Sequence, residues 1–437
     1  EMATDIGVPF HPAAKEFYLF IESSSLSWWK IRQYPGRGTS LRPAPTHTCQ
    51  RPARLRCRAD GRPHIRRENP MQLSILLDKM PLITRIARLI LVGMAAWHLY
   101  VAFVGPPNPY IMRGVHVALA LLLIFLTVNR KGLRNDVPSW YDVVLGLVAM
   151  SAALYPSLNL NYITQRFLYV DPLMPMDIVV GITLVLLLLE ATRRMLGPML
   201  PITAILFMAY GLAFTSTLPS VILEQLFMTP EGIFGIPIAV SATYMVLFIL
   251  FGSLVERMGV GQLFMDFAVA LTGRQVGGPA KVACVTSGLF GSVSGSAVAN
   301  VMTTGTFSIP LMKRMGFKPA FSGAVEAVAS TGGQIMPPVM GASAFVMAEY
   351  LGVGYLTVAK YALAPAILFY VALFAAVHFE AKRKGIGSVP KEDQVPLKTV
   401  LIDRGHLFLP LAIIVGVLMM GYSAPYAALC GIVSVVP

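Results

Sequence analysis

Long apolar segments alternate with short polar ones from residue 83 to the end of the chain. A helix that crosses a bilayer needs about 20 consecutive, mostly apolar residues. Segments that fit this length lie at 83–104, 111–128, 140–157, 176–195, 197–219, 236–255 and 355–378. A longer interrupted crossing is expected at 319–351, and two more spans at 407–421 and 423–437. The pattern predicts an all-α polytopic membrane protein built as a transmembrane helix bundle.

Two shorter segments, 220–235 and 262–273, are mixed in character and fit helices that lie along the membrane surface. The basic residues between the long segments indicate orientation, because cytoplasmic loops carry an excess of Lys and Arg. Loop 129–136 is basic, Arg193 and Arg194 close the fourth span, and loop 105–110 carries no charge. We therefore expect the chain to enter the first span from the cytoplasm and to return there after four crossings.

The segment 277–318 has an apolar middle and basic residues near both ends: Arg274, Lys281, Lys313, Arg314 and Lys318. Positive charge at both ends places both ends on the cytoplasmic side, so the chain is expected to enter the bilayer and turn back as a re-entrant hairpin. Irregular backbone at membrane depth is tolerated only inside protein or beside a water-filled cavity. The segment is therefore predicted to hold a solute or an ion.

The centre of this hairpin, GLFGSVSGSAVAN at 288–300, is rich in hydroxyl groups and glycine. The candidate residues for binding an ion or a solute are Ser292, Ser294, Gly295, Ser296, Asn300, Thr303 and Thr304. No carboxylate lies between residues 277 and 318, which argues against a Mg²⁺ or Zn²⁺ centre and favours a monovalent cation. The half-helix after the turn can also direct its N–H groups at an anion. The alternative is close helix packing by small residues.

The next crossing contains ASTGGQIMPPVMGAS at 329–343, in which two Gly and two Pro interrupt the helix. A break at the membrane midplane frees carbonyl groups, and interrupted helices mark transporter sites. The candidate binding site here comprises Ser330, Thr331, Gly332, Gly333, Gln334, Pro337 and Pro338, and Glu326 is a candidate buried acid. The alternative is a kinked helix whose freed groups bond to neighbouring helices.

Composition supports this class of protein, since 55% of residues are hydrophobic and only 13% are charged. Residues 1–70 differ from the rest because they are rich in Arg and Pro. They carry 12 Lys and Arg against 6 Asp and Glu, so they contribute nearly half of the chain's net charge of +13. We interpret 1–70 as a disordered or non-native extension and expect the natural chain to begin at Met71, in the cytoplasm. The alternative is a basic arm that binds nucleic acid or lipid. Because this stretch lacks interleaved aromatic residues and a folded context, no nucleic-acid partner is expected.

Several sequence features argue against an enzyme. The four cysteines form no CxxC pair, and no HExxH, GxSxG, Walker or dinucleotide-binding pattern occurs. A membrane-embedded enzyme needs a cluster of His, Asp or Glu at one membrane face, and the sequence offers none. No cofactor is therefore expected.

Residues 277–352, with the GSVSGS and STGGQIMPP stretches, strongly resemble the membrane permease of tripartite ATP-independent periplasmic (TRAP) transporters. Residues 188–202, LLEATRRMLGPMLPI, resemble the junction of fused permeases that join small and large membrane subunits. This resemblance implies an elevator-type fold with two inverted repeats, each with a re-entrant hairpin and a broken helix. It also implies that the hairpin tip at 286–300 binds sodium and substrate and that the break at 330–338 supplies carbonyls to the same sodium site. Sodium would be the coupling ion that drives uptake of organic acid anions, such as C4-dicarboxylates, delivered by a periplasmic binding protein at the bacterial inner membrane.

The resemblance also implies a domain organisation. Residues 71–196 would be the four-helix small-subunit part, and 197–437 the first half of the large-subunit part. The second repeat, with its own hairpin, would follow residue 437, so the chain is expected to be truncated and not to transport alone. A stand-alone sodium/dicarboxylate symporter of the same architecture, independent of a binding protein, is the remaining alternative within transport.

Overall fold

The computed structural model describes residues 82–133, 138–390, 392 and 394–435, and in this part of the chain it contains helices and loops but no strand. Seven helices among these residues are long and apolar enough to cross a membrane. The prediction of an all-α polytopic membrane protein is therefore confirmed. The predicted extension 1–70 lies outside the described residues.

The first four predicted spans are helices at nearly the expected positions: α3 (Leu82–Val104), α4 (Pro109–Thr127), α5 (Trp140–Leu158) and α7 (Pro175–Leu196). A short helix, α6 (Leu160–Gln165), lies between α5 and α7. Helices α4 and α7 both begin with a proline. Before α4, the Asn108 side chain accepts from Tyr110 N, whereas in α7 the carboxylate of Asp177, in the first turn, accepts from Met174 N just before the helix.

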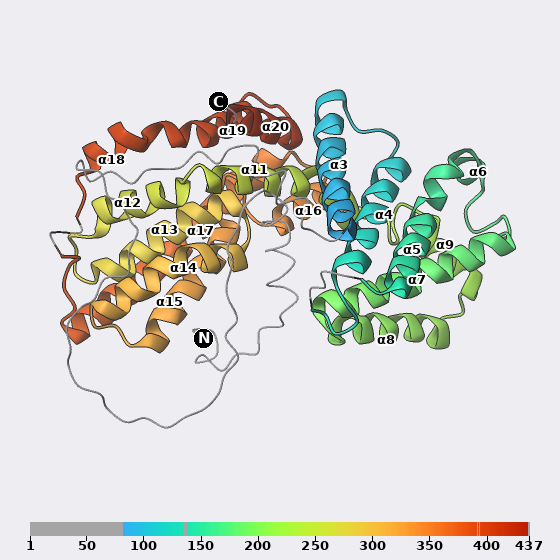
Figure 1. Cartoon of the computed structure of the whole chain (residues 1–437), viewed down its shortest axis with the longest axis horizontal. Coiled ribbons are helices and arrows are strands. Elements are labelled where there is room, and N and C mark those ends of the chain that lie inside the picture. Colours follow the sequence, from blue (N-terminus) through green and yellow to red (C-terminus); the bar gives the residue numbers. More distant parts are fainter. Residues whose placement is uncertain (1–81, 134–137, 391, 393, 436–437) are drawn as a thin grey trace, which may run out of the picture.

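Helices α4, α5 and α7 form one core together with α9 (Pro219–Phe227). Figure 1 shows these four helices grouped at the right of the molecule. Ala149 and Ala153 of α5 are fully buried there, and a methyl group added to Gly146 would lie 3.2 Å from Leu122 of α4. Small residues allow this close approach of two helices. Since α9 follows residue 196 but completes this core, the two predicted domains share packing.

Helix α8 (Met199–Phe214) is shorter than the predicted span 197–219. It ends before Thr215, Ser216 and Thr217, whose hydroxyls compete with helical backbone bonds, and before Pro219, which disfavours helix in the residue preceding it. Each of the two segments predicted to lie along the membrane surface overlaps with a helix: 220–235 with α9 and 262–273 with α12 (Val260–Thr272). The sixth span comprises α10 (Ile236–Val240), the π-helix η2 (Ser241–Met245) and α11 (Val246–Arg257).

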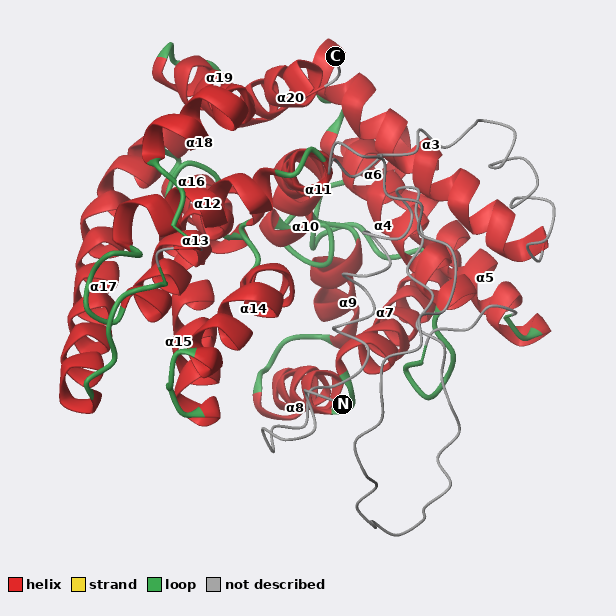
Figure 2. Ribbon diagram, turned by 60° about the vertical axis from the view of Figure 1, so that its left-hand side comes forward, coloured by secondary structure: helices red, strands yellow, loops and turns green. Residues whose placement is uncertain are grey.

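The rest of the chain forms a second group of helices. Its members are α13 (Gly278–Ser294), α14 (Ala297–Arg314), α15 (Pro319–Gly332), η3 (Gly333–Ile335), α16 (Ala342–Leu351), α17 (Tyr355–Lys384), α18 (Leu397–Arg404), η5 (Gly405–Phe408), α19 (Leu409–Met419) and α20 (Ala424–Val435). Helices α13, α14, α15 and α17 pack on one another, and α18 to α20 cover one edge in Figures 1 and 2. Helix α3 joins the groups, because it contacts α4, α11 and α20.

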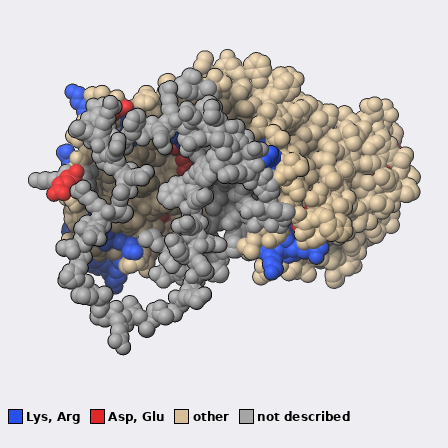
Figure 3. Space-filling view, in the orientation of Figure 1, with Lys and Arg blue, Asp and Glu red and all other residues tan. Residues whose placement is uncertain are grey.

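The outer surface of the described residues is largely apolar. Figure 3 shows uncharged atoms over most of the visible face outside the grey residues, with Lys and Arg in a few separate groups. On helix α17, for example, the side chains of Tyr361, Leu368 and Phe379 are each more than half exposed. A surface of this kind suits lipid rather than water.

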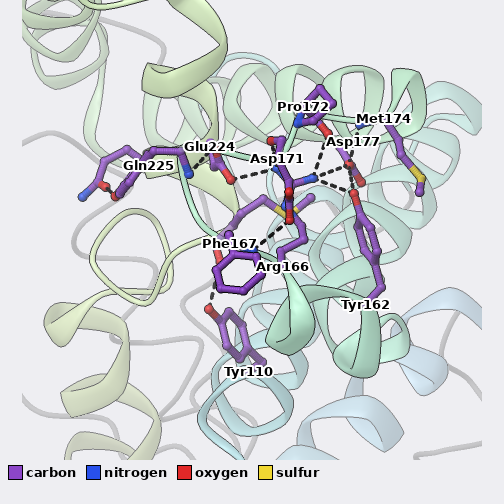
Figure 4. Close-up of polar contacts among 12 residues, drawn as sticks. Tyr110, Tyr162, Arg166, Phe167, Asp171, Pro172, Met174, Asp177, Glu224 and Gln225 are labelled. Carbon is purple, nitrogen blue, oxygen red and sulfur yellow. Dashed lines mark hydrogen bonds and ion pairs between the residues drawn. The ribbon is translucent and has the colours of Figure 1, made fainter.

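A buried ion cluster fastens the loop between α6 and α7 to α9 (Figure 4). The Arg166 guanidinium donates to Glu224 Oε1 at 2.9 Å and to the Tyr162 hydroxyl at 2.7 Å, and lies 3.7 Å from Asp177 Oδ2. The Tyr162 hydroxyl in turn donates to Asp177 at 2.7 Å. The side chains of Arg166, Asp177 and Glu224 are at most 4% exposed. One guanidinium therefore balances two buried carboxylates from α7 and α9.

Candidate functional site

The predicted hairpin is present as two helices joined by a two-residue turn. Helix α13 ends at Ser294 and α14 begins at Ala297. Gly295 has the left-handed conformation (φ 62°) and its N–H donates to Gly291 O at 2.9 Å, which is the usual ending of a helix. The Ser296 side chain accepts from Ala299 N at 3.3 Å and so caps α14. Glycine and serine at the tip therefore reverse the chain direction.

The predicted helix break is also present. Helix α15 ends at Gly332, a single turn of 3₁₀ helix follows, and the chain is not helical again until Ala342. The intervening stretch contains the cis peptide between Pro337 and Pro338. Two consecutive prolines supply no N–H groups, so the helix cannot continue through them.

The hairpin end and the helix break touch backbone to backbone. A Cβ atom built on Gly291 would lie 2.4 Å from Gly333 Cα, and one on Gly333 would lie 2.6 Å from Gly291 Cα. A Cβ on Gly295 would lie 2.1 Å from Met340 O, and Val339 N donates to Ser292 O at 3.0 Å. The two motifs that were predicted separately therefore form one structural unit.

Part of the backbone freed by the break is bonded within the protein. The Tyr355 hydroxyl donates toward Pro338 O at 2.9 Å and also contacts Val339 O. Gly341 N donates to Gln334 O at 2.7 Å. Just before the break, the Tyr370 hydroxyl donates at 2.7 Å to Ala329 O, which also accepts from Gly333 N. Sequence reasoning missed these two tyrosines of α17. Their hydroxyls in an otherwise apolar helix were the available signal, because buried Tyr O–H groups take hydrogen-bond partners.

The three serines of the hairpin tip differ in their surroundings. Ser292 donates to Leu289 O of its own helix at 2.7 Å, and Ser296 caps α14. The Ser294 Oγ atom is buried and has no hydrogen-bond partner in the described residues. Most buried polar atoms are hydrogen-bonded, so an unpaired one asks for an explanation. A ligand at the tip would provide a partner for Ser294.

The other polar residues of the hairpin follow the tip on α14, and the nearest, Asn300, lies against the contact with the helix break: a Cβ built on Gly291 would lie 2.9 Å from its Nδ2. Asn300 is fully buried, and its side chain donates to Ser287 O at 2.7 Å, which ties the two arms together. The Thr303 hydroxyl donates to Glu256 Oε1 of α11 at 2.8 Å. Thr304 faces α15, where its hydroxyl contacts Glu326. These three residues bond to other helices rather than lining the turn.

Glu326 lies at the centre of a buried cluster of hydroxyl groups. Its carboxylate is fully buried and accepts from Ser287 at 2.9 Å and Ser330 at 3.2 Å, and it also contacts the hydroxyls of Thr304 and Ser308. No Lys or Arg among the described residues forms an ion pair with it. Hydroxyl groups from α13, α14 and α15 therefore satisfy the hydrogen-bonding capacity of this buried carboxyl group.

Ser287 and Ser308 were not among the predicted residues. Thr304 and Ser308 are four residues apart on α14, and Glu326 and Ser330 are four apart on α15, so each pair shares one helix face. This spacing could have indicated that the two faces contact each other.

The remaining predicted residues surround the break. Thr331 is exposed, and its hydroxyl donates to Ala327 O at 2.8 Å. Gln334, Pro337 and Pro338 are half-buried. Gly332 packs against α17, since an added Cβ would lie 2.2 Å from Phe369. No group of three or more His, Cys, Asp or Glu in the described part of the chain could hold a metal ion. The groups available to a ligand are hydroxyls, amides, carbonyls and one carboxylate.

Comparison with known proteins agrees with this geometry. Residues 183–436 match the family model for the DctM component of the tripartite ATP-independent periplasmic transporter. The chain is 31% identical over 144 residues to the C4-dicarboxylate TRAP transporter large permease protein DctM of Pseudomonas aeruginosa, which covers 33% of each chain. It is 26% identical over 181 residues to the sialic acid TRAP transporter large permease protein SiaM of Vibrio cholerae, covering 41% of this chain and 42% of SiaM.

A third relative is the isethionate TRAP transporter permease protein DctMQ of Oleidesulfovibrio alaskensis. The chain is 28% identical to it over 138 residues, which is 32% of this chain and 21% of DctMQ. In each of these comparisons the matched stretch spans less than half of the relative. The family model itself covers more than half of the present chain and includes both the hairpin and the broken helix. The chain therefore belongs to the permease family of tripartite ATP-independent periplasmic transporters, which are membrane transport proteins and not enzymes.

Proposed function

We propose that the chain is the membrane permease of a sodium-coupled secondary transporter that imports organic acid anions across the bacterial inner membrane with a periplasmic binding protein. Relatives are named for C4-dicarboxylates, sialic acid and isethionate, and all three are organic acid anions. We infer a substrate of this class, with C4-dicarboxylates as the first to test. The observation that carries the proposal is the contact of a hydroxyl-rich hairpin tip with a broken helix.

The chemistry of this contact suits a sodium ion. The tip presents the buried, unpartnered hydroxyl of Ser294, and the adjacent break contributes backbone at Gly333 and Met340 that lies against Gly291 and Gly295. Neutral oxygen ligands bind a monovalent cation weakly enough to release it, as transport requires. The first N–H groups of α14 lie at the same tip and suit the carboxylate of a substrate.

The four helices α3, α4, α5 and α7 are proposed to serve as the membrane anchor of a fused permease. Their shared core with α9 and the contacts of α3 with α11 and α20 would hold the anchor to the transport part. The proposed periplasmic partner would deliver substrate to the tip side of the hairpin. A stand-alone symporter of the same architecture would need no such partner, so the requirement for it distinguishes the two functions.

The test is uptake of radiolabelled succinate into proteoliposomes that contain the full-length permease, since this chain alone is not expected to transport. We expect uptake only with an inward sodium gradient and only when the cognate binding protein is added outside. Uptake that needs sodium but not the binding protein would favour the stand-alone symporter. Uptake that is the same when potassium replaces sodium would refute sodium coupling.

A further inference from the structure

An apolar groove runs along the outer flank of α17. It has a volume of about 510 Å³ and is lined by Ile367, Tyr370, Val371, Phe374, Ala375 and Phe379 of that helix. Met336 of the helix break lies among its walls, and Lys281 and His378 form its polar part. Residues 367 and 379 are twelve positions apart, which corresponds to about 18 Å along a helix. The groove is thus about as long as one lipid acyl chain.

Lys281, in the first turn of α13, is the charged group of this groove. It is only 4% exposed. Its ammonium donates to Gln275 Oε1 at 2.8 Å and to His378 Nδ1 at 3.2 Å, and it lies 4.8 Å from the centre of the Phe374 ring. Gln275 and Phe374 are uncharged, and His378 contacts the ammonium through a ring nitrogen that accepts the hydrogen bond. No carboxylate among the described residues lies within 4 Å of Lys281 Nζ.

A buried ammonium without a counter-ion is costly, and Lys281 keeps unused capacity to bind one. An ammonium has three N–H donors and two are engaged. Because an ammonium can only donate, His378 accepts through Nδ1, and its neutral ring then carries a proton on Nε2. The polar end of the groove can therefore offer a charged donor and an imidazole donor to the same anion.

The position of this end agrees with a lipid headgroup. His378 lies six residues before Lys384, in the last part of α17, and Lys382, Arg383 and Lys384 form its basic end. Basic residues of this kind mark the cytoplasmic membrane surface, where anionic headgroups lie. The rest of the groove is apolar and reaches toward Met336. A small organic acid anion would pair with the ammonium but leave that apolar length unfilled.

We propose that this groove binds an anionic phospholipid, with the phosphate on Lys281 and His378 and one acyl chain along α17. The inference does not depend on the transported substrate or the coupling ion. It requires only that the chain is a membrane protein. The lipid would lie directly against the arm α13 of the hairpin and against Met336 of the break.

The test is lipid binding to the purified, delipidated permease in detergent, measured by native mass spectrometry. Phosphatidylglycerol and phosphatidylcholine with identical acyl chains are the two probes. We expect phosphatidylglycerol to bind about fivefold more tightly, the factor typical of one basic residue near an anionic lipid. Lys281→Met should abolish this preference, whereas Lys313→Met, at an exposed position of α14, should keep it.

A second variant tests the apolar part of the groove. Ala375→Phe fills the groove without changing charge, so it should weaken binding of both lipids while the melting temperature stays near that of the parent. Equal affinity of the parent protein for the two lipids would overturn the proposal, as would a preference that survives in Lys281→Met. Displacement of bound phosphatidylglycerol by millimolar succinate would also overturn it, because the site would then recognise the small anion.

Discussion

Gly291 of α13 and Gly333, the first residue of η3, meet with no side chain between them: a Cβ atom on either would fall within 2.6 Å of the other's Cα. This contact joins the hairpin tip to the helix break. Backbone cannot yield as a flexible side chain can, so neither position has room for another residue. The relationship explains why two glycines, forty-two positions apart in the chain, are needed at one point of the fold.

The first prediction concerns this contact. Gly291→Ala and Gly333→Ala should each destabilise the protein by about 1–3 kcal/mol through overpacking, seen as a lower melting temperature in detergent. Gly416→Ala is the matched control, because an added Cβ in the middle of α19 meets nothing within 4 Å. That variant should be neutral or slightly stabilising. Equal melting temperatures for all three variants would mean that the contact is not tight.

The second prediction separates two neighbouring serines. Ser294→Ala removes a hydroxyl without an internal partner, so the melting temperature should not fall. If that hydroxyl binds sodium, the sodium concentration for half-maximal uptake by the full-length permease should rise about fivefold, because the loss of one contact of about 1 kcal/mol weakens binding by this factor. Ser292→Ala loses only a bond to Leu289 O of its own helix and should keep the parent sodium dependence. The same sodium dependence in both variants would remove Ser294 from the proposed site.

The third prediction concerns the carboxylate under the hairpin. Glu326→Ala leaves the buried hydroxyls around it without their shared acceptor and opens a cavity, so it should cost about 3 kcal/mol of stability. Glu349→Ala, at an exposed position of α16, is the control and should change the melting temperature little. A loss in Glu326→Ala no larger than in the control would show that the hydroxyls find other partners.

The fourth prediction concerns the ion cluster of Arg166. Arg166→Met leaves Asp177 and Glu224 buried without their cation, and breaking a buried ion pair on one side costs about 3–5 kcal/mol. Arg193→Met is the control, since its side chain is 40% exposed and pairs with Glu190 at a helix end. Such pairs contribute only about 0–1 kcal/mol. The two variants should therefore differ clearly in a thermal unfolding assay, and similar losses would argue against a closed cluster.

Most of the helices could be predicted from the sequence. A bilayer requires about 20 apolar residues for each crossing, and this length requirement located α3, α4, α5 and α7 nearly to the residue. The tip at Gly295 and the break after Gly332 were also predictable, because Gly tolerates the left-handed conformation and two adjacent prolines supply no N–H groups for a helix. Helix α8 was predicted too long, since apolar composition continues past the point where Thr215 and its neighbours end the helix.

The contacts across helices could not be predicted in the same way. Asn300 and Thr303 looked equivalent to the tip serines in sequence, but they bond to Ser287 O and Glu256 instead. In the sequence, Lys281 is one of several basic residues near the ends of the hairpin, whereas in the structure it is buried beside Phe374 and His378. Helix rotation sets which side chain faces which neighbour, and rotation depends on packing between distant segments.

The sequence alone determined that this is a helical membrane protein with a hairpin and a broken helix, because hydrophobic length, charge at segment ends, and Gly and Pro act locally. Only the tertiary structure decided that Gly291 meets Gly333, that Glu326 is held by hydroxyls from three helices, and that Ser294 is left without a partner. These relationships arise from the close approach of helices far apart in the chain, and no local pattern of residues encodes that distance.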